Sequence, residues 1–241
     1  MEFVNTYQSV AYAGDYAKLD FSNTYHLAFR DLPAIYSAHV KGNTALDFGC
    51  GAGRSTRFLR GLGFETIGVD ISPEMVAKGP EIDPQGDYRL IPGDDMSGLP
   101  HASFSLIQSA FTFDNIPGLD NKVRLFRDLR GLLQPDGILA NIVSSPEIYV
   151  NEWASFSTRD FPENRSAKPG DTVRTITTEF DDPTPCVDIF WPHESYLDVY
   201  SRAGLEIVEM RKPLANGDEP YRWVSETRIA PWVIYVLRGS N

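Results

Sequence analysis

The feature that most constrains this 241-residue chain is the segment ALDFGCGAGR at 45–54. A short apolar run ends in Asp47, and glycines follow at alternate positions: Gly49, Gly51 and Gly53. Glycine can adopt left-handed backbone conformations and lets a ligand lie against bare main chain. The segment therefore predicts a buried strand that turns sharply into a helix, with a nucleotide-type loop between them.

The spacing of the glycines distinguishes two kinds of nucleotide loop. A dinucleotide fingerprint reads G-x-G-x-x-G, whereas this chain has G-x-G-x-G. Asp47 would repel a phosphate, but it could orient a positively charged ligand group through water or the loop amides. The pattern resembles the first motif of class I S-adenosylmethionine-dependent methyltransferases, whose loop cradles the methionine half of the cofactor; a turn that binds no ligand is the alternative. The resemblance assigns to the cofactor Asp47, Gly49, Cys50, Gly51, Gly53 and Arg54.

The second predicted strand, 64–71, carries an acid near its end. An acidic side chain at a strand tip beside a glycine loop can accept hydrogen bonds from both hydroxyls of a ribose. Asp70, Ile71 and the helix-starting Ser72 follow the order of the family's second motif, so the resemblance assigns Asp70 and Ile71 to the cofactor. A capping role for Asp70 is the alternative.

A Gly-Asp-Asp-Met sequence follows the third predicted strand, 88–91. At the carboxyl edge of a sheet, one aspartate can accept from an adenine amino group while an apolar neighbour covers the ring. The resemblance assigns the adenine to Asp94, with Asp95 and Met96 beside it. A surface turn is the alternative.

The fourth predicted strand, 104–111, ends where the cofactor crosses the sheet edge, next to the first strand. Many members of the family carry a histidine after this strand, but this chain has FDNIP at 113–117. Asp114 is therefore a candidate for holding or deprotonating a nucleophile, with a turn carboxylate as the alternative. The residues assigned to this tip are Ser109 and Ala110 for the cofactor and Phe111 for the substrate.

The first 30 residues are rich in tyrosine and phenylalanine. Tyrosine combines an apolar ring with a hydroxyl, which suits a lid over a mixed ligand. The resemblance implies that Tyr7 and Tyr16 close over the cofactor and shape the substrate pocket, and that Tyr7 takes part in catalysis. An amphipathic helix packed on the domain is the alternative.

An aromatic-rich insertion at 146–191 interrupts the alternation of strands and helices. Residues 172–180 and 186–190 have the pattern of two paired strands. Because the insertion follows the fifth strand, it lies at the ligand-bearing edge and is interpreted as a substrate cover. Its aromatic residues favour a flat or apolar acceptor or, alternatively, form a small core of their own. The residues assigned to the substrate are Tyr149, Trp153 and Trp191.

His193 follows the insertion directly and precedes a helix that ends near Gly204. A histidine can accept a proton near neutral pH, so His193 is the best general base among the four histidines and a candidate substrate contact. A solvent-facing residue in the first turn of the helix is the alternative.

The chain is expected to form one α/β domain over residues 1–241. A Pro-Asp-Gly turn at 135–137 should lead into the fifth strand, and two strands at 205–210 and 231–237 should close the sheet. The resemblance implies a Rossmann-like, doubly wound, seven-stranded sheet of order 3-2-1-4-5-7-6 with strand 7 antiparallel. The predicted parts are N-terminal lid helices at 1–40, a cofactor-binding core at 41–145, the insertion at 146–191, and a final helix with the antiparallel edge at 192–241.

The charge and the cysteine count exclude several partners. The net charge is −11 and lysine and arginine form no long run, so neither nucleic acid nor an anionic membrane is expected as a partner. Two cysteines make neither a disulfide framework nor a zinc site, and no segment has the pattern of a signal peptide or of a membrane span. We expect a cytoplasmic monomer or homodimer with a small-molecule substrate.

The chemistry that the resemblance implies is methyl transfer from S-adenosylmethionine, leaving S-adenosylhomocysteine. The protein then needs only to hold the acceptor in line, with a base where the acceptor carries a proton. No metal is expected, because the Asp-Asn pair of metal-dependent catechol methylation is not reproduced. The aromatic insertion and the 223–232 tail resemble toxoflavin-type N-methyltransferases, which implies N- or O-methylation of an aromatic or heterocyclic secondary metabolite. A non-catalytic, cofactor-binding regulatory protein is the alternative from another class.

Overall fold

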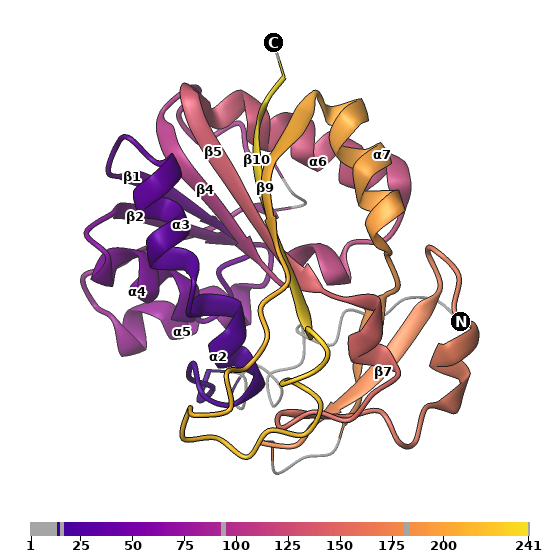
Figure 1. The fold of residues 1–241 in the computed structure, drawn as a ribbon. Helices are drawn as coiled ribbons and strands as arrows, with labels where there is room; N and C mark the ends of the chain where they lie inside the picture. The colour runs from indigo at the N-terminus through magenta and orange to yellow at the C-terminus, as the bar shows by residue number, and fades with distance from the viewer. Residues whose placement is uncertain (1–13, 15–16, 93–94, 181–183, 241) are drawn as a thin grey trace.

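A seven-stranded sheet forms the centre of the computed structural model, which describes residues 14, 17–92, 95–180 and 184–240 (Figure 1). The strand order is β3-β2-β1-β4-β5-β10-β9. The first five of these strands are parallel, and β10 runs antiparallel to both β5 and β9. The expected order and the antiparallel strand are confirmed. The strands are β1 Thr44–Phe48, β2 Glu65–Asp70, β3 Asp87–Leu90, β4 Phe104–Ala110, β5 Leu133–Ser144, β9 Leu205–Arg211 and β10 Trp232–Gly239.

Helices cover both faces of the sheet, as the near-continuous apolar strands require. One core contains Leu46 of β1 together with side chains of α6 and α7, and the other contains Ala45 of the same strand together with side chains of α2, α3 and α4. Successive strand residues thus point to opposite helix layers. The helices are α2 Thr24–Phe29, α3 Leu32–His39, α4 Arg54–Gly61, α5 Pro73–Ile82, α6 Leu119–Leu132 and α7 His193–Ala203.

The described part of the predicted N-terminal lid belongs to the helix layer. Leu27 of α2 and Ile35 of α3 are fully buried in the core against the sheet. These two helices are therefore packing elements rather than a movable cover. The predictions for Tyr7 and Tyr16 lie outside the described residues.

The Pro-Asp-Gly segment at 135–137 lies inside β5 instead of preceding it. Leu133 pairs with Phe104 and Ile138 pairs with Leu106, so the extra residues of β5 form an irregularity in the register. A Cβ atom on Gly137 would lie 2.7 Å from the carbonyl oxygen of Phe104. The turn residues thus bulge out of a longer strand, and the predicted strand start was wrong.

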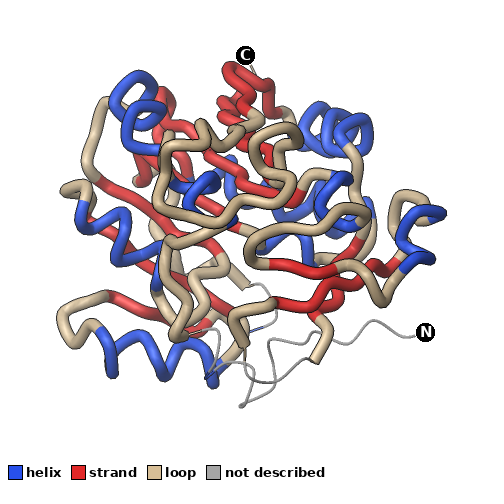
Figure 2. Tube along the Cα trace, turned by 60° about the horizontal axis from the view of Figure 1, so that its bottom comes forward, coloured by secondary structure: helices blue, strands red, loops and turns tan. Residues whose placement is uncertain are grey.

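The insertion forms a second, three-stranded antiparallel sheet of order β6-β7-β8. The expected pairing of β7 (Thr172–Thr177) with β8 (Cys186–Ile189) is confirmed, whereas the two-residue β6 (Phe156–Ser157) was not predicted. β8 lies against η3 (Thr112–Asn115), the 3-10 helix that follows β4. The small sheet therefore lies at the carboxyl edge of the large one, which Figure 2 turns toward the viewer. Two further 3-10 helices in the insertion are η4 Pro146–Tyr149 and η5 Pro162–Ser166.

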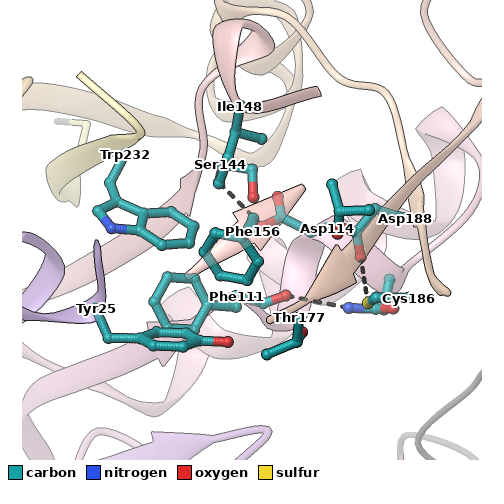
Figure 3. A pocket seen from close by; sticks show the side chains of 12 residues that line it. Tyr25, Phe111, Asp114, Ser144, Ile148, Phe156, Thr177, Cys186, Asp188 and Trp232 are labelled. Carbon is teal, nitrogen blue, oxygen red and sulfur yellow. Dashed lines mark hydrogen bonds between the residues drawn. The ribbon is translucent and has the colours of Figure 1, made fainter. Parts of the chain in front are cut away.

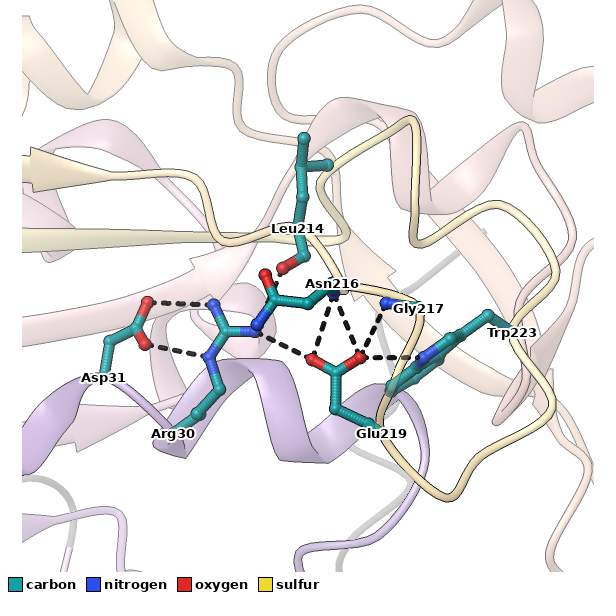
Figure 4. Close-up of polar contacts among 7 residues, drawn as sticks. All are labelled: Arg30, Asp31, Leu214, Asn216, Gly217, Glu219 and Trp223. Carbon is teal, nitrogen blue, oxygen red and sulfur yellow. Dashed lines mark hydrogen bonds and ion pairs between the residues drawn. The ribbon is translucent and has the colours of Figure 1, made fainter.

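Arg30, between α2 and α3, binds the long connection that joins β9 to β10 (Figure 4). Arg30 donates hydrogen bonds to the carbonyl oxygen of Leu214 at 3.0 Å and to Oε1 of Glu219 at 3.1 Å. Burial opposes ionisation of Glu219, but the amides of Asn216 and Gly217 and the indole N–H of a tryptophan outweigh it and lower its pKa to about 2. The connection is therefore an ordered part of the fold.

None of the helices in the described ranges has the length and apolar character needed to cross a bilayer.

Candidate active site

The loop between β1 and α4 has three glycines with positive φ angles: 74° at Gly49, 54° at Gly51 and 84° at Gly53. A Cβ atom on Gly49 would come within 2.1 Å of the Thr112 hydroxyl, and one on Gly53 within 2.4 Å of the Tyr88 ring. Only glycine meets both the backbone conformation and these close approaches. The loop thus presents main chain rather than side chains at the sheet edge.

Asp47, in β1, binds the residues that follow this loop. Its carboxylate is fully buried and accepts hydrogen bonds from the hydroxyls of Ser55 (2.6 Å) and Thr56 (2.7 Å) and, more weakly, from Gln108 (3.4 Å). Burial raises the pKa of Asp47 to about 6, although these bonds lower it. Asp47 therefore holds the first turn of α4 onto β1, and any effect it has on a ligand passes through the loop.

Asp70, at the end of β2, faces the glycine loop directly. Its two carboxylate oxygens accept the backbone N–H of Gly51 at 2.8 Å and of Ser72 at 2.9 Å, while burial raises its pKa. A carboxylate has about four acceptor positions, so two remain for the hydroxyls of a ribose. The next side chain, Ile71, is 40% exposed and offers an apolar surface beside them. These residues fit the adenosyl half of the expected cofactor.

Several other predicted cofactor residues pack within the protein instead of presenting a side chain to a ligand. The Cys50 thiol is buried, which raises its pKa, and Met96 is buried in the main core. The Arg54 guanidinium lies over the Tyr25 ring, 4.6 Å from its centroid, and links the loop to α2. Asp95 is exposed. Ser109 and Ala110 end β4, and Asp94 lies outside the described residues.

A cavity of about 30 Å³ opens beyond the tip of β4, with an aromatic side and a polar side (Figure 3). This volume holds one or two water molecules. On the aromatic side, ring centroids lie between 4.6 and 6.0 Å apart. The aromatic side consists of Tyr25, Phe111, Phe156 and Trp232 with Ile148, and the polar side of Asp114, Asn115, Ser144, Thr175, Thr177, Cys186 and Asp188.

The cavity lies next to the glycine loop. Phe111 lines it with φ at 65°, a left-handed conformation that is unusual for a bulky residue. The following residue, Thr112, donates a hydrogen bond to the carbonyl oxygen of Phe48 at 3.0 Å. Trp232 is held beside Tyr25 by a 2.7 Å hydrogen bond from its indole N–H to the carbonyl oxygen of Thr24.

Two buried carboxylates and one buried lysine surround the polar side. Asp114 accepts the backbone N–H of Ser144 at 3.0 Å, and burial raises its pKa to about 6. Burial and the nearby Asp114 raise the pKa of Asp188, on β8, to about 8. Lys122 donates to the carbonyl oxygen of Phe113 outside the cavity lining, and burial lowers its pKa to about 7. The structure thus brings the predicted Asp114 together with Asp188, a residue that was not predicted to belong to the site.

The predicted base His193 does not line this cavity. Its Nδ1 lies 2.9 Å from the Tyr235 hydroxyl, and its ring stacks on the Tyr235 ring. It lines a separate cavity of about 220 Å³ together with Trp191, and the two cavities share Ser144. The structure therefore brings neither His193 nor Trp191 together with Asp114.

The two remaining predicted substrate residues lie behind the cavity wall. Trp153 is buried and donates from its indole N–H to the carbonyl oxygen of Ile148 at 2.8 Å, within a core that the insertion shares with α2 and β10. Tyr149 is also buried, and its hydroxyl donates to Asp188 at 3.2 Å. Of the aromatic residues predicted for the substrate, Phe111 alone lines the cavity among those that the structure describes.

No group of three or more His, Cys, Asp and Glu side chains in the described ranges is arranged to hold a metal ion.

Known proteins resemble this chain in sequence and in fold. Residues 46–141 match a family model described as a methyltransferase domain. An N-demethylindolmycin N-methyltransferase from Streptomyces griseus is 26% identical over 187 residues, which cover 76% of this chain and 78% of that protein. A 2-methyl-6-phytyl-1,4-hydroquinone methyltransferase from Synechocystis is 27% identical over 82% of this chain, but the match spans only 59% of that protein. The solved CcbJ methyltransferase from Streptomyces caelestis has the same fold, with a TM-score of 0.68 and 18% identity over 99% of this chain and 100% of that one.

Proposed function

This chain is a class I S-adenosylmethionine-dependent methyltransferase of the type 11 group, and from that premise we propose that it methylates a small aromatic or heterocyclic metabolite. The observation that carries the proposal is the aromatic-lined cavity at the tip of β4. Its lining residue Phe111 directly precedes Thr112, which is bonded to Phe48 at the end of β1, just before the glycine loop. The two relatives are named for small-molecule acceptors, an indolmycin precursor and a hydroquinone, which supports the same class.

We propose that the glycine loop, Asp70 and Ile71 hold the cofactor. The loop amides would bind its methionine half, the free acceptor positions of Asp70 its ribose, and Ile71 its adenine. When bound, S-adenosylmethionine supplies a methyl group on a positively charged sulfur, which is already a good leaving group. We also propose that Asp94 binds the adenine and that Tyr7 and Tyr16 cover the cofactor; these three residues lie outside the described ranges.

The acceptor would lie in the cavity, covered by the insertion at 146–191. The rings of Phe111 and Trp232 would hold it flat and exclude water, and Asp114 would hold its nucleophilic atom or take its proton. Since the cavity is small, an acceptor must move aside part of the wall or of the segments that cover it. Holding an acceptor atom roughly 3 Å from the methyl carbon and in line with the carbon–sulfur bond supplies most of the rate enhancement.

The proposal is tested by product formation. The wild-type protein is incubated with S-adenosylmethionine and a panel of aromatic and heterocyclic amines and phenols, and mass spectrometry detects a gain of one methyl group together with S-adenosylhomocysteine. Gly51→Val should abolish both products, because valine cannot adopt a φ of 54° at the loop. Gly63→Val is the matched control, since Gly63 also has a positive φ and the substitution imposes a similar backbone strain, but at the far end of α4 and outside the loop. Cofactor binding without any methylated product over the whole panel would argue for the non-catalytic alternative.

A further inference from the structure

The polar side of the cavity is acidic. Of the described residues that line it, the charged ones are Asp114 from η3 and Asp188 from β8, and none is Lys, Arg or His. Figure 3 shows both carboxylates on the side of the cavity opposite the rings of Tyr25 and Trp232. Both are more than nine-tenths buried, at 4% and 8% exposed. A ligand that enters this cavity therefore meets two carboxylates and a wall of aromatic rings.

The chain itself compensates these two negative charges only in part. Lys122 is the nearby cation, but its ammonium group donates to the carbonyl oxygen of Phe113 and lies 5.1 Å from the centroid of the Trp191 ring, away from the cavity. Two like charges buried at one site disfavour ionisation of both, and a cation between them reverses this effect. The electrostatics of the cavity favour a positively charged occupant.

An unpaired acceptor in the same cavity gives an independent indication. Asn115 lines the cavity, and its side-chain Oδ1 is buried without a hydrogen-bond donor among the residues that the structure describes. Its Nδ2 donates to the carbonyl oxygen of Phe111 at 3.4 Å, which fixes the orientation of the amide. A buried acceptor without a donor is costly, and a ligand with several N–H groups would satisfy it.

We propose that the methyl acceptor is an aliphatic amine carried on a short side chain of an aromatic or heterocyclic ring. Its protonated nitrogen binds between Asp114 and Asp188 with an N–H toward Asn115, and its ring packs against Phe111 and Trp232. Aromatic walls also stabilise a bound cation through their π faces. This inference rests on the proposed function, because it names the substrate class of the same site.

The same arrangement assigns a catalytic role to Asp188. The ammonium form of the acceptor has no lone pair, so one proton must first leave the nitrogen. That proton passes to the Asp188 carboxylate, which burial and Asp114 make a better base than an exposed aspartate. The nitrogen lone pair then forms the new C–N bond while the C–S bond breaks and its electron pair stays on sulfur. The products are the methylated ammonium ion and S-adenosylhomocysteine, and Asp188 releases its proton to water.

The test compares amines with alcohols of matched shape. Wild-type protein saturated with S-adenosylhomocysteine is titrated calorimetrically at pH 9, above the pKa of Asp188 at about 8 and below the pKa of an alkylamine at about 10, with phenethylamine and 2-phenylethanol, and with tryptamine and tryptophol. We expect each amine to bind at least about tenfold more tightly than its alcohol, which corresponds to one good charge-assisted hydrogen bond. Asp188→Asn should remove this preference without changing the affinity for S-adenosylhomocysteine. Asp160→Asn, an exposed aspartate of the same insertion, is the matched control and should keep the preference.

The possible outcomes separate this inference from the proposed function. Equal affinity for amines and alcohols, no binding of any amine, or a preference that survives Asp188→Asn each overturns the amine assignment. Should Asp188→Asn fail to fold, the wild-type comparison of each pair decides alone. Failure of S-adenosylhomocysteine to bind would instead contradict the proposed function, and the amine and alcohol titrations can be repeated without it.

Discussion

Thr112 donates a hydrogen bond from its hydroxyl to the carbonyl oxygen of Phe48 across 3.0 Å, and this bond joins the start of η3, just after β4, to the end of β1. It fixes the wall of the aromatic cavity relative to the glycine loop, because Phe111 precedes Thr112 and Gly49 follows Phe48. In the proposed function, the distance between the cofactor and the acceptor therefore depends on this contact.

Removing the hydroxyl of Thr112 should loosen the loop. Thr112→Val keeps the shape of the side chain and loses the bond, so we expect the free energy of unfolding to fall by about 1 kcal/mol. The affinity for S-adenosylhomocysteine should weaken several-fold. Urea unfolding and calorimetry measure the two effects. Thr112→Ser keeps the hydroxyl and should resemble the wild type; a valine variant that is equally unaffected would show that the bond is unimportant.

Asp70 should contribute to cofactor affinity through both of its oxygens. Asp70→Asn replaces one acceptor oxygen by an N–H donor, which faces the amide of Gly51 or of Ser72. We expect the affinity for S-adenosylmethionine to fall by about tenfold or more, equivalent to the loss of a charge-assisted hydrogen bond. Asp87→Asn, an exposed aspartate on β3, serves as the control. Equal affinities of the two variants would exclude Asp70 from the binding site.

The stability of the protein should depend on the ionisation of Asp188. Its pKa is about 8 in the folded protein against an ordinary value of 3.8, so its contribution to stability is fully present below pH 4 and is lost as the pH rises through about 8. Asp188→Asn does not ionise and should therefore gain stability relative to the wild type between pH 4 and pH 8. The titratable groups that influence Asp188 are Asp114, Lys122, Tyr149 and Cys186.

Thermal or urea unfolding of both proteins at several pH values measures this difference. A difference that stays constant from pH 4 to pH 8 would mean that Asp188 ionises as an exposed aspartate does. Asp160→Asn, which changes an exposed aspartate of the same insertion, is the control variant.

Trp153 should matter for stability and not for the acceptor. Trp153→Phe removes the hydrogen bond to the carbonyl oxygen of Ile148 and leaves unfilled space in a buried core, so the free energy of unfolding should fall by about 1–3 kcal/mol. The KM for an acceptor identified from the panel should stay unchanged. A large increase in KM with unchanged stability would support the original assignment of Trp153 to the substrate.

The geometry of much of the proposed cofactor site could be predicted because its residues are local in sequence. The alternating glycines Gly49, Gly51 and Gly53 predict the positive φ angles that the structure has, and Asp70 ends a strand whose apolar pattern is clear. Parallel strands bring their carboxyl ends to one edge of the sheet. The order of the strands alone therefore predicts that Asp70 lies close to the glycine loop.

The acceptor half could be predicted only in part, because its residues come from distant segments. Asp114 was identified from the tip of β4, but Asp188 reaches the same cavity through an insertion whose docking the sequence does not specify. A signal was nevertheless present. In the predicted strand at 186–190, Asp188 occupies the next position on the same face as Cys186. A charged residue at a buried strand position indicates a functional or paired group.

The assignment of His193 relied on residue type and on its place beside the insertion. The structure places it at the start of α7, against Tyr235 and on a different cavity. The end of the insertion packs, through Trp191, against the helix layer that contains α6 and α7. No local sequence pattern shows which face of the sheet this segment reaches.

The central claim is that the glycine loop and Asp70 form a binding site for S-adenosylmethionine, and calorimetric titration of the purified wild-type protein with S-adenosylhomocysteine tests it most directly. We predict saturable binding of one molecule per chain, which Gly51→Val abolishes and Gly63→Val retains. Absence of binding to the wild-type protein, or binding that Gly51→Val leaves unchanged, would contradict the claim.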